Sequence, residues 1–244
     1  MLTPDELARY DRQLGIPGWG QDAQERLKRS RVFVAGAGGL GSPVILYLAA
    51  AGVGELIVCD SDVIEPSNLN RQIIHRSDRL GSEKASSAAS SAMAINPLVS
   101  VRAVHAMITS KNAGRLIDGV DLVIDCLDNF ETRHLLNRAI VEKGIPMIHG
   151  GVAGFAGQVM FIDTPETACL ACVFPRAKKE RFSITGPTAG IIGSIQALEA
   201  LRYCTGIGPS LKGKILFWDG FAMSCETIGV EPNQRCSVCR HVRK

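Results

Sequence analysis

Short apolar runs alternate with longer segments of helical character through the first 150 positions. Strands are predicted at residues 31–35, 55–59, 99–104, 121–126 and 146–149. Helices are predicted between them, at residues 40–51, 82–95, 110–117 and 131–143. Brief apolar strands separated by helices are typical of βαβ units, whose strands are buried on both faces. The pattern therefore predicts a mostly parallel, Rossmann-like α/β sheet flanked by helices.

The two ends of the chain depart from this alternation. Residues 1–28 are predicted to form a helical arm with a turn at Pro17-Gly18, and Thr3, Pro4 and Glu6 are a favourable helix start. Beyond residue 150, strands of an edge or antiparallel kind are predicted at 157–162, 214–218 and 224–229, with one apolar helix at 188–204. No linker separates the halves, so we expect a single domain with a strand-rich C-terminal extension.

Composition narrows the class of protein. The 244 residues are 46% hydrophobic and 21% charged, as in an ordinary soluble globular protein. The formal charge of +3 is too small to argue for a nucleic-acid or membrane partner. No apolar run reaches the roughly 18 residues of a membrane span, and the charged N-terminus lacks a signal-peptide core. We therefore expect a cytoplasmic protein whose eight cysteines are thiols or metal ligands.

A glycine-rich turn joins the first predicted strand to the first helix of the alternation. It contains Gly36, Gly38, Gly39 and Gly41, and Asp60 ends the next strand 19 residues after Gly41. Glycines let backbone N–H groups approach a phosphate at a helix N-terminus, and an acidic residue at this distance holds a ribose. The turn indicates a nucleotide-binding site, but it does not show whether the nucleotide is NAD, FAD or ATP. The alternative is a tight turn that binds no ligand.

Charged and amide side chains near this edge favour ATP. They are Ser67, Asn68, Asn70 and Arg71 after the second strand, Lys84 at the next helix, and Asp128 with Asn129 after the fourth strand. A triphosphate requires cations, and arginine offers it a bidentate fork. An aspartate near the phosphates could hold Mg²⁺. Each residue alone could equally be an ordinary surface or helix residue.

Four cysteines form two CxxC pairs, at Cys169/Cys172 and Cys236/Cys239. Two such pairs complete a tetrahedral site suited to Zn²⁺, and four thiolates leave no open position, so we expect a structural role. Redox-active CxxC motifs and two unrelated thiol pairs are the alternatives. Core packing is expected for the other four cysteines, which are Cys59, Cys126, Cys204 and Cys225.

Several short motifs occur together along nearly the whole chain, from about residue 7 to residue 239. They are RYDRQ at 9–13, the glycine turn, Asp60 with Asp62, SNLNRQ at 67–72, Lys84, CLDN at 126–129 and the two CxxC pairs. This combination resembles the MoeB/ThiF/HesA family, which is related to the adenylation domain of ubiquitin-activating enzymes. Its members are adenylyltransferases that activate ubiquitin-like proteins.

The resemblance implies roles for individual residues. The glycine turn would contact the ATP phosphates, Asp60 would hold the ribose, and Asp128 would bind Mg²⁺. Asn68, Arg71 and Lys84 would bind the triphosphate, and Arg12 would reach into the site of the other subunit of a homodimer. The nucleotide site is completed by Asp62, Ser67, Asn70 and Asn129. The core carrying this site would span about residues 29–150, and the extension at about 151–244 would carry the zinc and bind the carrier.

The implied reaction is attack of a carrier's C-terminal carboxylate on the α-phosphorus of ATP, with release of pyrophosphate. The carrier would be a small ubiquitin-like sulfur-carrier protein ending in Gly-Gly, used in molybdopterin, thiamine or related sulfur-transfer biosynthesis. Many relatives have a cysteine in the loop before the predicted helix at 188–204, but residues 176–187 contain none. A covalent step on that loop is therefore not expected, and the sulfur donor would be a separate protein. The basic run at 176–181 could meet an acidic carrier or pyrophosphate, or simply be solvated.

Two other functions remain open at the level of sequence. An NAD(P)- or FAD-dependent oxidoreductase could use the same glycine turn, and a non-catalytic scaffold could retain the fold and the zinc. His75, His134 and His149 belong to no proton-relay motif, so we interpret them as ordinary residues. Intact Arg71, Lys84 and Asp128 argue against a decayed scaffold.

Overall fold

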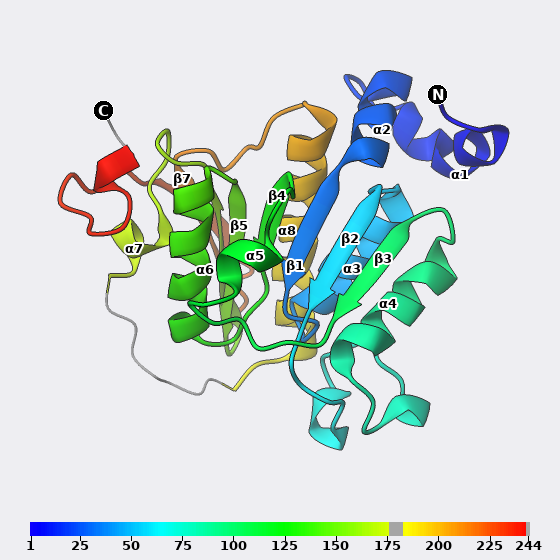
Figure 1. The fold of residues 1–244 in the computed structure, drawn as a ribbon, viewed down its shortest axis with the longest axis horizontal. Coiled ribbons are helices and arrows are strands. Elements are labelled where there is room, and N and C mark those ends of the chain that lie inside the picture. The colour runs from blue at the N-terminus through cyan, green and yellow to red at the C-terminus, as the bar shows by residue number, and fades with distance from the viewer. Residues whose placement is uncertain (176–182, 243–244) are drawn as a thin grey trace.

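An eight-stranded sheet forms the centre of the protein in a computed structural model that describes residues 1–175 and 183–242 (Figure 1). Its strands follow the order β3-β2-β1-β4-β5-β6-β7-β8. They are β1 (Arg31–Ala35), β2 (Glu55–Cys59), β3 (Ser100–Val104), β4 (Leu122–Asp125), β5 (Met147–Ala153), β6 (Ala156–Ile162), β7 (Lys214–Asp219) and β8 (Ser224–Gly229). The strands from β3 to β5 pair in parallel, and those from β5 to β8 pair antiparallel. The predicted α/β sheet with a strand-rich extension is confirmed, and the extension continues the same sheet.

Helices cover both faces of the sheet. They are α1 (Pro4–Leu14), α2 (Gly20–Arg29), α3 (Gly41–Ala51), α4 (Lys84–Ile95), α5 (Ala113–Leu116), α6 (Phe130–Lys143), α7 (Leu170–Val173) and α8 (Gly186–Thr205). One apolar core packs α3, α4 and α8 against one face, and a second packs α5 and α6 against the other (Figure 1). Short 3₁₀ turns lie at Pro66–Asn68, Ser77–Arg79 and Arg240–Val242. None of the described helices combines the length and apolar character that a membrane span requires.

Among the strands and helices predicted from residue 31 onward, the boundaries differ from the predicted ones by more than two residues at two elements. The helix predicted at 110–117 is only the single turn of α5, and the strand predicted at 146–149 extends to Ala153. Gly150 and Gly151 interrupt the apolar run, so the sequence pattern does not predict the rest of β5. A Cβ at Gly150 would lie 2.4 Å from the side chain of Gln196 on α8. Glycine is therefore required by close packing within the strand, while pairing with β6 over seven residues stabilises β5.

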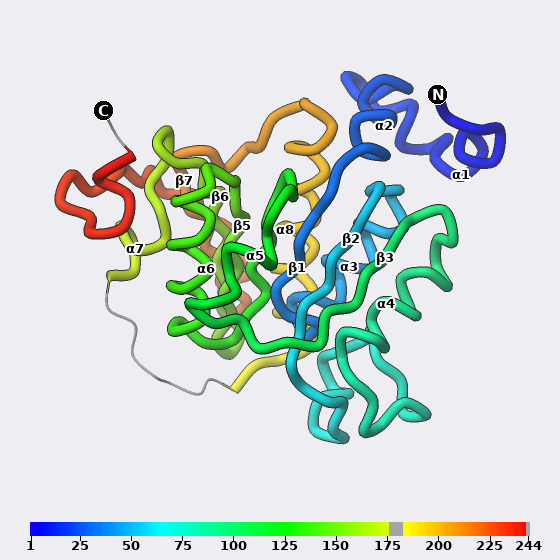
Figure 2. The backbone as a smooth tube through the Cα atoms, in the orientation of Figure 1, coloured from blue at the N-terminus to red at the C-terminus, as the bar shows by residue number. Residues whose placement is uncertain are grey.

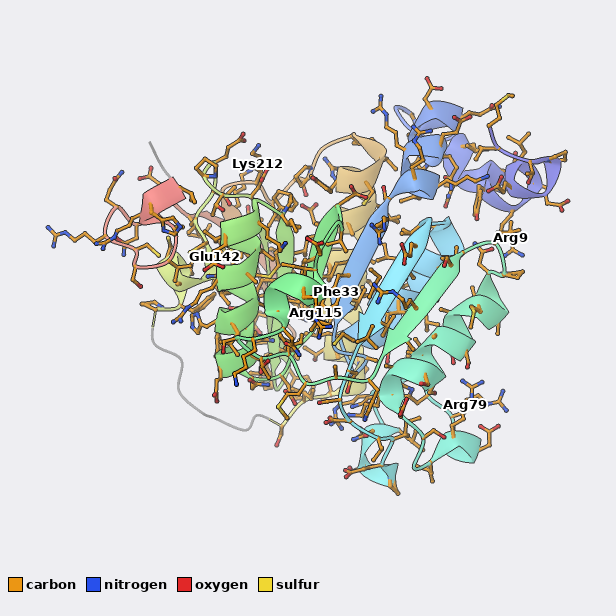
Figure 3. All side chains as sticks on the ribbon, viewed as in Figure 1. Arg9, Phe33, Arg79, Arg115, Glu142 and Lys212 are labelled. Atoms are coloured by element: carbon orange, nitrogen blue, oxygen red, sulfur yellow. The ribbon has the colours of Figure 1, made fainter. Side chains whose placement is uncertain are left out.

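The N-terminal arm lies against the end of the sheet where the parallel strands begin (Figure 2). Thr3 caps α1 in a capping box with Glu6, as predicted. Gln13 Nε2 donates to the carbonyl of Ala51 at the end of α3 (2.7 Å), and Arg9 donates to the carbonyl of Ile95 at the end of α4 (3.1 Å). Since both helices run back from the carboxyl edge, α1 lies at the opposite end from the glycine turn. Arg9 and Arg79 lie near the two ends of α4 (Figure 3).

Candidate nucleotide and metal sites

The glycine turn is held by close contacts that exclude larger residues. Gly36 has a φ of +99°, and a Cβ there would lie 2.7 Å from the carbonyl oxygen of Cys126. A Cβ on Gly41 would lie 2.1 Å from the carbonyl oxygen of Gly36. The turn therefore folds tightly against the end of β4. Among the described residues, the backbone N–H groups of Gly38 and Gly39 have no hydrogen-bond acceptor, so these donors are available to an anion.

An acidic pair links the turn to α4. The Asp60 carboxylate accepts a hydrogen bond from the Ala37 N–H (2.8 Å) and another from the Asp62 N–H (2.9 Å). The Asp62 carboxylate in turn pairs with Lys84 Nζ at 2.8 Å. The Lys84 side chain is buried, whereas Asp62 is exposed. The structure thus brings Asp60, Asp62 and Lys84 together at the carboxyl edge of the sheet.

Arg71 and the amides lie on the neighbouring turn. Arg71 donates to the carbonyl of Ser67 (2.9 Å) and to Asn70 Oδ1 (3.0 Å). Its aliphatic stem passes within 3.6 Å of the position that a Cβ on Gly39 would occupy. Asn68 is buried, and its Oδ1 accepts from the Glu65 N–H (3.0 Å), which shapes the turn. Arg71 is therefore beside the open glycine N–H groups, while Asn68 in this arrangement supports the loop.

Asp128 and Asn129 follow β4 at the same edge. Asn129 Oδ1 accepts the Thr132 N–H (2.9 Å) and so caps α6. Asn129 Nδ2 donates to Asp128 Oδ1 at 3.3 Å, and the Asp128 side chain is exposed. The backbone of Cys126 and Leu127 borders Gly36, so Asp128, the next residue, follows a segment that contacts the glycine turn. Because Asp128 is exposed, a cation at this edge could reach its carboxylate.

The structure does not bring Arg12 to this edge within one chain. Arg12 is exposed on α1, at the amino end of the sheet. The residue can act on a nucleotide only if it belongs to a different subunit from the one that binds it.

A buried polar cluster beneath Asp128 has no counterpart in the sequence motifs. His149 Nδ1 contacts Asp125 Oδ2 at 2.7 Å, and Arg133 Nε lies 3.4 Å from the same oxygen. Arg133 also donates to the carbonyls of Leu127 and Gly150. Burial alone would raise the pKa of Asp125. The charge of Arg133 and the interactions with His149 outweigh it and hold this pKa below its usual value. The cluster fixes the backbone that leads into Asp128, and it gives His149 a structural contact that no sequence motif indicates.

The four CxxC cysteines converge on one point between α7 and the C-terminal tail. Three sulfur pairs are 3.8, 3.7 and 3.4 Å apart, and all four sulfurs lie within 4.8 Å of one another. A tetrahedral zinc with Zn–S bonds of about 2.3 Å requires sulfurs about 3.8 Å apart, so the donor set fits Zn²⁺. A hydrogen bond with Cys169 lowers the pKa of Cys172 to about 4, which favours a thiolate ligand there. All four are free thiols in this structure.

The remaining cysteines differ from one another. Cys59, Cys126 and Cys204 are buried, as expected. Cys225 is exposed, so the expectation of core packing was wrong for this residue. It lies on β8, an edge strand whose six residues are all exposed. The strand is at the edge of the sheet, so its position in the fold explains why Cys225 is exposed.

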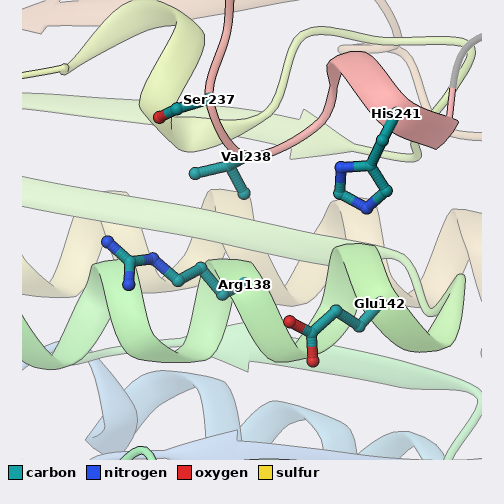
Figure 4. Close-up of a pocket in the computed structure, with 5 residues that line it drawn as sticks. All are labelled: Arg138, Glu142, Ser237, Val238 and His241. Carbon is teal, nitrogen blue, oxygen red and sulfur yellow. The ribbon is translucent and has the colours of Figure 1, made fainter.

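A cavity of about 250 Å³ lies between α6 and the C-terminal tail, away from the glycine turn (Figure 4). Arg138 and Glu142 line it from α6, and Ser237, Val238 and His241 line it from the tail. The wall formed by the tail belongs to the segment that carries the second CxxC pair. The cavity is therefore part of the surroundings of the cysteine cluster and is not continuous with the residues around Arg71.

A glycine turn at the carboxyl edge of a parallel sheet defines the class of Rossmann-like nucleotide-binding proteins. The family model described as "ThiF family" matches residues 10–238. The chain belongs to the ThiF family. This result confirms the resemblance drawn from the motifs.

Relatives with known names cover nearly the whole chain. SAMP-activating enzyme E1 of Haloferax volcanii is 42% identical over 98% of this chain and 90% of its own length. The sulfur carrier protein adenylyltransferase of Thermus thermophilus is 41% identical over 97% of this chain and 92% of its own length. The crystal structure of Escherichia coli MccB with ATP superimposes with a TM-score of 0.86. It is 21% identical and covers 95% of this chain and 74% of that one, so it supports the fold alone.

Proposed function

We propose that this protein uses ATP and Mg²⁺ to adenylate the C-terminal carboxylate of a small ubiquitin-like sulfur-carrier protein ending in Gly-Gly. The observation that carries the proposal is the placement of Arg71 beside the unsatisfied glycine N–H groups, with Lys84 linked to the same turn through Asp62 and Asp60. A polyphosphate needs cations and N–H donors together, whereas a redox coenzyme has no such need for both cations. The names of the two sulfur-carrier relatives support the same reaction.

The proposed chemistry relies on positioning and electrostatics. The carrier's carboxylate is already ionised at neutral pH, so no general base is required. The Gly38 and Gly39 N–H groups would hold phosphate oxygens, and Arg71 and Lys84 would stabilise the charge that spreads over the α-phosphate. Lys84 would exchange its contact with Asp62 for the phosphate. Asp60 would hold the ribose, with Ser67, Asn68, Asn70 and Asn129 shaping the site.

The residues present also fit the two metals. Asp128 would hold Mg²⁺, which when bound neutralises part of the phosphate charge. The four clustered cysteines would hold a structural Zn²⁺ that joins the tail to α7. Thiolate ligation of this kind suits the reducing cytoplasm, where we place the protein. Arg12 would complete the site of the partner in a homodimer, and a separate protein would supply sulfur to the acyl-adenylate.

ATP–pyrophosphate exchange tests the proposal directly. The purified protein is mixed with ATP, Mg²⁺, labelled pyrophosphate and each candidate carrier encoded in the same genome. We expect label to enter ATP only with a carrier ending in Gly-Gly, and we expect none when that carrier lacks its last two residues. Exchange that ignores the truncation, or no exchange with any such carrier, would refute the proposed function.

A further inference from the structure

His75 is buried directly beneath the glycine turn and contacts it. Its Nε2 lies 2.9 Å from the carbonyl oxygen of Ala37, and its Nδ1 lies 3.1 Å from Ser87 Oγ on α4. A carbonyl oxygen only accepts hydrogen bonds, so the proton of the neutral ring must be on Nε2. Nδ1 then accepts from the Ser87 hydroxyl, which fixes the orientation of the ring. The side chain is thus a rigid link between α4 and the glycine turn.

The Ala37 carbonyl belongs to the same peptide group as the Gly38 N–H. A trans peptide is planar, and its C=O and N–H bonds point in opposite directions. Holding the Ala37 oxygen towards His75 therefore aims the Gly38 N–H away from His75. This N–H has no acceptor among the described residues. It is therefore an unpaired donor whose direction is set by the imidazole, and a ligand can accept its hydrogen bond.

The next peptide of the turn is held from the same side. Ser42 contributes both its N–H (2.9 Å) and its Oγ (2.7 Å) to the carbonyl of Gly38, which aims the Gly39 N–H in the same way. The Ile74 N–H contacts Ser42 Oγ at 3.4 Å. Gln72, one turn earlier, is buried beside Gly38, and its Oε1 has no hydrogen-bond partner. The buried Gln72 amide thus adds a polar group beside the open N–H of Gly38.

The geometry points to His75 as a positioning residue of the nucleotide site, which sets the direction of the Gly38 N–H through the Ala37 carbonyl. This inference rests on the proposed ATP-dependent function. Glycine turns are mobile without side chains to anchor them, so a fixed peptide direction lowers the cost of binding a phosphate.

The electrostatic surroundings are consistent with a neutral ring. Burial lowers the pKa of His75, as do Lys84 and Arg79, while the bond to Ala37 and the charge of Asp60 raise it. The balance lies below the ordinary value, so the imidazole keeps one N–H and one acceptor at neutral pH. Both are used by the contacts to Ala37 and Ser87.

A matched pair of substitutions separates this role from simple core packing. Glutamine is long enough to place an amide N–H where Nε2 lies, so His75→Gln retains the donor to Ala37. Asparagine reaches only the place of Nδ1, so His75→Asn retains a contact to Ser87 and leaves the Ala37 carbonyl without a donor. Calorimetric titration of the full-length protein with ATP and Mg²⁺, without carrier, gives the dissociation constant, and thermal unfolding gives Tm.

We expect His75→Asn to raise the dissociation constant of magnesium-bound ATP about tenfold, and His75→Gln to stay within about twofold of the wild type. The two variants should have similar Tm values. Ser87→Ala should weaken binding about threefold by releasing the ring, and Ser90→Ala on the exposed face of α4 should not change it. Equal affinities for the two His75 variants, or an affinity that only follows Tm, would overturn the inference.

The two proposals fail in different ways. If the wild type does not bind magnesium-bound ATP, the proposed function is refuted, and the role of His75 falls with it. If the wild type binds ATP and catalyses carrier-dependent exchange while the His75 and Ser87 variants bind as it does, only the role of His75 is refuted.

Discussion

Asp125 is a buried carboxylate whose charge is balanced by two neighbouring side chains. Its side chain is fully buried, and it is paired with Arg133 and His149, which are also buried. Arg133 also contacts the ring of Phe130 at 5.1 Å. The loss of one partner from a buried ion pair leaves an uncompensated charge, which is far more costly than the loss of an exposed pair.

Arg133→Met should therefore destabilise the protein by about 3–5 kcal/mol. The substitution leaves Asp125 short of a counter-charge and also removes the donor to the carbonyls of Leu127 and Gly150. Urea unfolding followed by circular dichroism measures the change. Arg138→Met, at an exposed position of the same helix, is the control and should cost little. If the two variants have the same free energy of unfolding, the cluster of Asp125, Arg133 and His149 does not stabilise the fold.

His149 makes the stability dependent on pH. Burial lowers its pKa, and Arg133 lowers it further against the opposing effect of the Asp125 hydrogen bond. Below about pH 6.5, the unfolded chain binds a proton that the folded chain does not. We expect Tm to fall as the pH is lowered from 7 to 5, and His149→Gln to reduce this slope. His105→Gln changes an exposed histidine and is the control, so it should leave the slope of Tm against pH unchanged. If His105→Gln reduces the slope as much as His149→Gln does, the assignment of the pH dependence to His149 is refuted.

At the scale of elements, α7 and the C-terminal tail are too short to be stable alone. α7 has four residues, and within the described part of the tail after β8 the only helical element is the 3₁₀ turn Arg240–Val242. The N–H of Leu170 donates to Asn137 Oδ1 on α6 (2.9 Å), and Phe174 packs against Phe130 and His149. The cysteine cluster therefore joins the tail to the helix that follows Asp128.

Cys169→Ser should remove zinc from the protein and expose the tail to proteolysis after the second CxxC pair. Atomic absorption measures the metal, and mass spectrometry of limited digests locates the cleavage. Cys225→Ser, which removes an exposed cysteine outside the cluster, is the control. This variant should retain both the zinc and the resistance of the tail to proteolysis. We expect exchange activity to decline only together with stability, since a closed site has a structural role. Full zinc content in Cys169→Ser would contradict the assignment.

Helices and strands were predicted best where a local period decides them. β1 and β2 were located to the residue, because each is a short apolar run between loop residues. α6 was predicted to within one residue of its bounds, and it ends at Gly144, whose φ is +64°. β5 was shortened in the prediction, because Gly150 is required by Gln196, which approaches from α8. Contacts between distant segments leave no period in the sequence.

On the scale of the whole molecule, the parts of the proposed site lie at two ends of the sheet. Arg71, Lys84 and Asp128 are at the carboxyl edge, while Arg12 on α1 is at the amino edge. In a homodimer with two-fold symmetry, each arm can serve the partner's site. If Arg12 acts on the nucleotide as we propose, its location on α1 requires that it do so in the partner of a dimer.

Complementation tests this arrangement. Arg12→Ala and Asp128→Ala should each abolish carrier-dependent exchange in separate preparations. When the two are unfolded and refolded together, mixed dimers contain one site with both residues intact, and random pairing restores about one quarter of the wild-type activity. Each variant refolded alone is the control. No recovery in the mixture, with mixed dimers verified by mass spectrometry, would show that Arg12 does not act across subunits.

The sequence by itself determined the features that depend on neighbouring residues. The capping box at Thr3, the glycine turn at Gly36 to Gly41 and the spacing within each CxxC pair are local, because backbone geometry and ligand reach set them over a few positions. Tertiary structure alone decided what distant segments do to one another. His75 reaches Ala37 across 38 positions, and Asp125 meets His149 across 24. Burial makes these polar contacts obligatory, and burial is a property of the packed molecule, to which no local pattern corresponds.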